Sequence, residues 1–84
     1  MRLERINPDR NEFRFYEVTI EPTLFGEHAL LIRWGRIGKP SRQRIAETGP
    51  VRLVAKTQQS IAAQKARGGY REVEVARKGS RSTL

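Results

Sequence analysis

The sequence contains no cysteine, and it has no apolar run close to the length that crosses a bilayer. Without cysteine, neither a disulfide framework nor a thiolate metal site can stabilise the chain. A spanning helix needs about 20 apolar residues, and the N-terminus also lacks the apolar segment of a signal peptide. We therefore expect no membrane partner and a cytoplasmic location, with association with the nucleoid if the source is bacterial.

Side chains suited to catalysis are also scarce. His28 is the sole histidine and Asp9 the sole aspartate, and they fall in different predicted loops. The sequence offers no closely spaced pair of metal-ligating residues on one face of an element, and Gly35 and Gly38 have the wrong spacing for a phosphate-binding loop. We therefore expect no enzyme activity, no metal site and no cofactor.

Positive charge is abundant but unevenly distributed. Of the net charge of +8, residues 1–32 contribute four basic and six acidic side chains, whereas residues 33–84 contribute thirteen basic and three acidic ones. Such a chain orients towards a polyanion, and nucleic acid is the most abundant polyanion in a cell. An anionic membrane fits less well, because the basic segments lack bulky apolar anchors. The plain alternative is that the charge only confers solubility.

Alternation of apolar and polar side chains predicts a mostly β structure. It is strongest over residues 13–21 and 29–36, which we expect to form an antiparallel pair because the loop between them is short. Weaker alternation predicts three further strands, at residues 2–6, 41–47 and 70–75. We expect the strand at residues 2–6 to lie at an edge of the sheet.

One helix is expected over residues 50–67. Thr48-Gly49-Pro50 has the composition of a helix start, with a capping residue before a proline, and Gly68-Gly69 ends the segment. The fold class is therefore α+β, a small antiparallel sheet of four to five strands packed against one α-helix. We expect residues 1–75 to form a single domain and residues 76–84 a flexible basic tail.

The sole tryptophan lies where the strand at residues 29–36 ends, and it is surrounded by basic residues. In a domain this small, Trp34 fits a core position, but its ring could also stack on a sugar or base while Arg33 or Arg36 contacts a phosphate. Gly35 inside a strand indicates a bulge or a close backbone approach. Lys39, Arg42 and Arg44 would extend a phosphate-binding strip, or simply form a solvated strand face.

Trp34-Gly35-Arg36, followed by Ile37-Gly38, resembles the signature of the WGR domain, a nucleic-acid-associated module of poly(ADP-ribose) polymerases and short bacterial proteins. The resemblance extends over residues 13–72 and includes Phe15-Tyr16-Glu17-Val18, Phe25-Gly26 and Gly68-Gly69-Tyr70. It implies a sheet packed on one helix, with Trp34 contacting the sugar or terminal base and Arg36 the nucleic-acid backbone.

Tyr70 and its neighbour complete the candidate site. Tyr70 could stack on a base or close the core, and Arg71 could extend the basic surface. We expect non-catalytic binding of nucleic acid, with double-stranded or broken DNA favoured, RNA left open, and a monomer as the favoured state. The alternative is an adaptor whose basic face docks on an acidic surface of a DNA-repair or replication protein.

Overall fold

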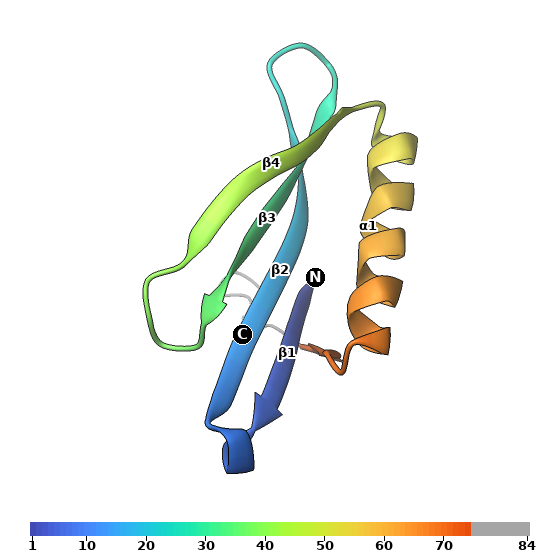
Figure 1. Cartoon of the computed structure of the whole chain (residues 1–84). Helices are drawn as coiled ribbons and strands as arrows, with labels where there is room; N and C mark the ends of the chain where they lie inside the picture. Colours follow the sequence, from blue (N-terminus) through green and yellow to red (C-terminus); the bar gives the residue numbers. More distant parts are fainter. Residues whose placement is uncertain (75–84) are drawn as a thin grey trace, which may run out of the picture.

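A computed structural model describes residues 1–74 and shows a five-stranded antiparallel sheet with one α-helix across it (Figure 1), which confirms the α+β class. The elements are β1 (Arg2–Asn7), the 3₁₀ turn η1 (Pro8–Arg10), β2 (Glu12–Pro22), β3 (His28–Arg36), β4 (Arg42–Gly49), α1 (Val51–Arg67) and β5 (Arg71–Val73).

The strands lie in the order β4-β3-β2-β1-β5. β3 pairs with β2 over its whole length, from Pro22 opposite His28 to Arg14 opposite Arg36, and the pair is antiparallel, as the short loop between the strands predicts. The prediction of β1 as an edge strand is wrong, because the short strand β5 pairs with Arg2–Glu4 on its outer side. The expected last strand is shorter than predicted, and both its end at Val75 and the predicted basic tail lie outside the described residues.

The core lies between the sheet and α1. Val18, Leu30, Ile32 and Val54 are almost completely buried there, which follows from the period of two in the strands and the apolar stripe of the helix. Gln58 interrupts that stripe, but its amide donates a 2.7 Å hydrogen bond to the carbonyl oxygen of Val18. The same oxygen also accepts a 3.2 Å hydrogen bond from the N-terminal amine of Met1. The polar side chain of Gln58 thus satisfies a main-chain acceptor between the helix and the sheet.

The helix begins differently from the prediction. The N-cap residue is Pro50, whose carbonyl accepts bonds from the amides of Leu53 and Val54, and no side chain caps the first turn. Thr48, the predicted capping residue, belongs to β4 and pairs with Ala29 instead. The other end is as predicted, because the helix stops at Arg67 and Gly68 follows as its C-cap.

Candidate nucleic-acid interface

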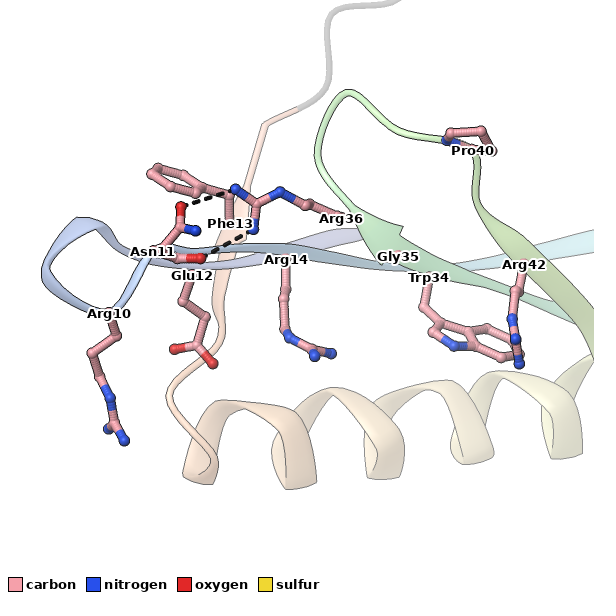
Figure 2. Close-up of a pocket in the computed structure, with 10 residues that line it drawn as sticks. All are labelled: Arg10, Asn11, Glu12, Phe13, Arg14, Trp34, Gly35, Arg36, Pro40 and Arg42. Carbon is pink, nitrogen blue, oxygen red and sulfur yellow. Dashed lines mark hydrogen bonds between the residues drawn. The ribbon is translucent and has the colours of Figure 1, made fainter.

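A shallow pocket of about 470 Å³ lies where β3 ends, between the start of β2 and the loop that leads into β4 (Figure 2). Four arginines line it, together with the tryptophan and a single carboxylate. Its lining consists of Arg10, Asn11, Glu12, Phe13, Arg14, Trp34, Gly35, Arg36, Pro40 and Arg42, which we call the arginine pocket.

Trp34 combines the two positions that the sequence allowed, a place in the core and a ring that is accessible at the surface. Its side chain points to the helix side of the sheet (Figure 2) and packs against the buried core, yet it stays half-buried and lines the arginine pocket. In the strand register it lies between Tyr16 of β2 and Arg42 of β4. The indole is therefore held by the core while part of it stays accessible from the pocket.

Gly35 is explained by a close backbone approach. A Cβ atom here would lie 3.3 Å from the Cα atom of Ser41 and 3.5 Å from the carbonyl oxygen of Pro40, so the backbone of the β3–β4 loop would have to move away by a few tenths of an ångström. The strand has no bulge here, because Gly35 stays in register with Phe15; the irregular pairing with β4 occurs between Leu30 and Leu31. The glycine lets the protein's own loop approach the strand.

Arg36 is exposed and is held by the turn between β1 and β2. Its guanidinium donates 3.0 Å hydrogen bonds to the main-chain and side-chain oxygens of Asn11 and lies 5.2 Å from the centroid of the Phe13 ring. Figure 2 shows this contact on the side of the sheet away from Trp34. The sequence predicts an indole and a guanidinium presented together; in the structure they line one pocket from opposite sides.

Three further arginines are exposed at the pocket. Arg10, Arg14 and Arg42 point to the same side as Trp34 (Figure 2), and within residues 1–74 none of the three forms an ion pair. Sequence reasoning missed Arg10 and Arg14. The signal for Arg14 was the period of two, which places it on the face of Tyr16, but its proximity to Arg36 depends on the register between β2 and β3.

The single carboxylate of the pocket is hydrogen-bonded to an arginine that does not line the pocket, although the charges of Arg10 and Arg14 also act on it. Glu12 accepts a 2.6 Å hydrogen bond from Arg5 of β1, and this bond lowers the pKa of the Glu12 carboxyl. Arg5 in turn donates to the carbonyl oxygen of Gly68 at the end of α1. The acid is thus committed to a contact that ties β1, β2 and the helix end together, and the pocket remains positively charged.

Arg33 lies on the opposite face of the sheet and outside the arginine pocket. Its guanidinium pairs with Glu17, which also accepts a 3.0 Å hydrogen bond from Arg2. Arg2 and Arg33 both lie over the ring of Phe15, at 4.5 and 5.8 Å from its centroid. Burial acts to raise the pKa of the Glu17 carboxyl, but the hydrogen bonds from Arg33 and Arg2 outweigh it and the pKa is lowered.

Two other predicted site residues, Lys39 and Arg44, are exposed but do not line the pocket. Arg44 is exposed on β4 opposite Ile32, on the face that Arg42 also occupies, and Lys39 is exposed in the β3–β4 turn. In the chain, Lys39 directly precedes the lining residue Pro40, and Arg44 follows the lining residue Arg42 by two positions.

Tyr70 closes the far end of the helix against the sheet. Its ring packs edge-on against Tyr16 with centroids 6.3 Å apart, and the amine of Lys65 lies 4.2 Å from the Tyr16 centroid. Arg71 is exposed on β5 opposite Glu4. The structure therefore brings neither Tyr70 nor Arg71 to the arginine pocket.

Within the described part of the chain, no helix is long and apolar enough to span a bilayer, and no three side chains of the His, Cys, Asp or Glu type gather as a metal site would require. The fold and the pocket define a small α+β domain with a half-buried tryptophan at the end of a strand and exposed arginines around it.

A comparison with protein families identifies the family of this domain. Residues 1–77 match the WGR domain family, and the chain belongs to it. A similar protein is the uncharacterized protein y4dW of Sinorhizobium fredii, 38% identical over 69 residues. That match covers 82% of this chain and 34% of the relative, so the chain spans about a third of the relative's length. No solved structure matches the sequence.

Proposed function

We propose that the protein binds nucleic acid without catalysis, with double-stranded or broken DNA as the preferred form, through sugar-phosphate contacts at the arginine pocket. The observation that carries the proposal is the set of exposed arginines without ion pairs in residues 1–74, Arg10, Arg14 and Arg42, beside the half-buried Trp34. Guanidinium groups fit phosphate oxygens in a forked geometry, and an accessible indole face can stack on a sugar or base.

The mechanism follows from the placement of these side chains. Arg36 is fixed by Asn11, which leaves other N–H donors of its guanidinium for a phosphate at the pocket rim. Arg14 and Arg42 can contact neighbouring phosphates from the helix side. Lys39, in the turn before β4, and Arg44, on β4, lie near Arg42 in the chain and can extend these contacts. Because phosphate contacts carry no base information, we expect little sequence preference.

A salt titration tests the proposal. Fluorescence anisotropy should show binding of labelled duplex DNA that weakens steeply as salt rises, because counterions are released from the phosphates. Arg42→Ala should reduce the affinity about fivefold at about 0.15 M salt and lower the log–log salt slope by about 1. Lys56→Ala removes the same charge from an exposed helix position outside the pocket and is the matched control, with an expected effect below about twofold.

Equal effects of the two variants, or tight binding that is indifferent to salt, would contradict the proposal. The same titration with blunt, nicked and single-stranded DNA and with RNA ranks the substrate forms. Because Trp34 is the sole tryptophan, its intrinsic fluorescence reports directly on the pocket, and we expect quenching in step with the anisotropy change.

The exposed arginines would equally suit an acidic protein surface, which keeps the adaptor function as the second candidate. A pull-down from nuclease-treated lysate separates the two. An adaptor keeps a DNA-repair or replication protein after nucleic acid is destroyed and loses it when Arg42 is replaced by alanine, because its basic face makes the contact. A nucleic-acid binder loses the material that was tethered through DNA.

A further inference from the structure

The β2–β3 loop carries the two most exposed large apolar side chains among residues 1–74. Leu24 is 94% exposed and Phe25 is 88% exposed, and both lie in the loop that projects beyond the sheet (Figure 1). The next most exposed, Ile45, is 60% exposed. Two adjacent apolar side chains left almost wholly in water cost solubility and add nothing to the core, which points to a contact with another molecule.

This loop is ordered by its own hydrogen bonds. The amide and the hydroxyl of Thr23 donate to the carbonyl oxygen of Glu27 at 2.8 and 3.1 Å, and the amide of Phe25 donates to the Thr23 hydroxyl at 3.3 Å. Gly26 supplies the positive φ of 80° that the turn needs. The backbone that carries the apolar pair is therefore ordered, so binding would not have to order the loop itself.

The charges around the loop restrict its partner. Glu21 and Glu27 flank the loop, and residues 21–27 contain no basic side chain. The arginine pocket lies at the other end of β3, where the strand ends at Arg36. Nucleic acid and anionic lipid would both be repelled by the flanking carboxylates, so neither fits the loop itself.

The flanking charges argue against self-association. A two-fold dimer presents the same surface on both copies, so the carboxylates of Glu21 and Glu27 would face their equivalents across the interface, and like charges repel. A small, rigid, apolar projection instead resembles the anchor residues that fill a pocket on a larger partner.

We propose that Leu24 and Phe25 form an anchor that inserts into an apolar pocket, rimmed by lysine or arginine, on a partner protein. The flanking Glu21 and Glu27 meet the basic rim. This contact is separate from the arginine pocket and does not depend on nucleic-acid binding, so the domain could hold a protein at one end and nucleic acid at the other.

Site-specific photocrosslinking in the full chain tests the proposal. A Leu24→p-benzoylphenylalanine variant is irradiated in nuclease-treated lysate of the organism that encodes the chain, with the same substitution at Lys56 as the control position. We expect an adduct with one protein, identified by mass spectrometry. Its yield should fall at least about tenfold with Phe25→Ser and likewise with Glu21→Lys and Glu27→Lys together, but not with Arg42→Ala.

Several results would overturn the proposal: an adduct with a second copy of this chain or with lipid; a yield no higher than at Lys56; or a yield unaffected by the charge reversal. Folding is checked independently. Because both side chains are exposed, Leu24→Ser with Phe25→Ser should leave the thermal midpoint within about 1 °C of the wild type. A fall of several degrees would show that the loop packs on its own domain, and it would equally overturn the proposal.

Discussion

Two groups of arginines in this domain differ in their electrostatic surroundings. On the face away from the helix, Arg2 and Arg33 share the carboxylate of Glu17 above the ring of Phe15. At the arginine pocket, Arg14 and Arg42 are exposed, and neither has a carboxylate partner among residues 1–74.

The two groups would contribute differently to binding a polyanion. An arginine that is already paired gives up a carboxylate contact when it binds a phosphate, so part of the gain is lost. An unpaired exposed arginine exchanges only water and counterions. Net charge alone therefore does not distinguish these two groups of arginines; the distribution of the carboxylates around them does.

The largest effect that this comparison predicts is on affinity for DNA. Arg10→Ala, Arg14→Ala and Arg42→Ala together should weaken binding by roughly 100-fold at about 0.15 M salt, because three phosphate contacts with their released counterions are lost. The log–log salt slope should fall by about 3. Anisotropy titrations at several salt concentrations measure both quantities. A large loss of affinity with an unchanged slope would mean that these arginines act through the fold and not through phosphate.

The second prediction concerns the core. Val54 is completely buried between α1 and the sheet, so Val54→Ala should lower the free energy of unfolding by about 2 kcal/mol through lost burial and the resulting cavity. Urea denaturation followed by Trp34 fluorescence measures this. The salt slope of binding should stay unchanged under conditions where the variant is folded, which separates stability from the contact surface.

The third prediction uses pH to examine the paired group. Arg33 and Arg2 hold the pKa of the Glu17 carboxyl below its ordinary value, so this carboxylate stabilises the fold above about pH 4.5 and the contribution is lost as the pH falls through the lowered pKa. Glu17→Gln should cost about 1 kcal/mol at pH 7 and less at pH 3. Urea denaturation at both values tests this, and an equal cost at both would show that ionisation of Glu17 does not matter.

The fold was largely predictable because its signals are local. Alternation over residues 13–21 and 29–36 predicted β2 and β3, and Gly68-Gly69 predicted the end of α1. The helix start was wrong for a nonlocal reason. Thr48 looks like a capping residue, but pairing with Ala29 on the neighbouring strand keeps it in β4.

The candidate site was predictable only in part. The sequence singles out Trp34, Arg36 and Arg42, since they cluster along the chain. Arg14 was missed because its place beside Arg36 depends on which residues of β2 and β3 face each other, and adjacent residues do not encode that register. The pairing of Arg33 with Glu17 has the same nonlocal origin, and it separates Arg33 from the pocket that its neighbour Trp34 lines.

The smallest predicted effect is the sharpest test of the comparison. Arg33→Ala removes one positive charge only three residues away in the chain from Arg36, yet it should change DNA affinity by less than about twofold and leave the salt slope unchanged. Arg33 is paired with Glu17 and lies outside the arginine pocket, on the face away from Trp34 and Arg42. Arg42→Ala, measured in the same titrations, is the reference. If Arg33→Ala lowered the slope as much as Arg42→Ala, the guanidinium would have to leave Glu17 for a phosphate when DNA binds. The pairing in the free protein would then be a resting contact, and the interface would extend around the sheet edge to include both groups of arginines.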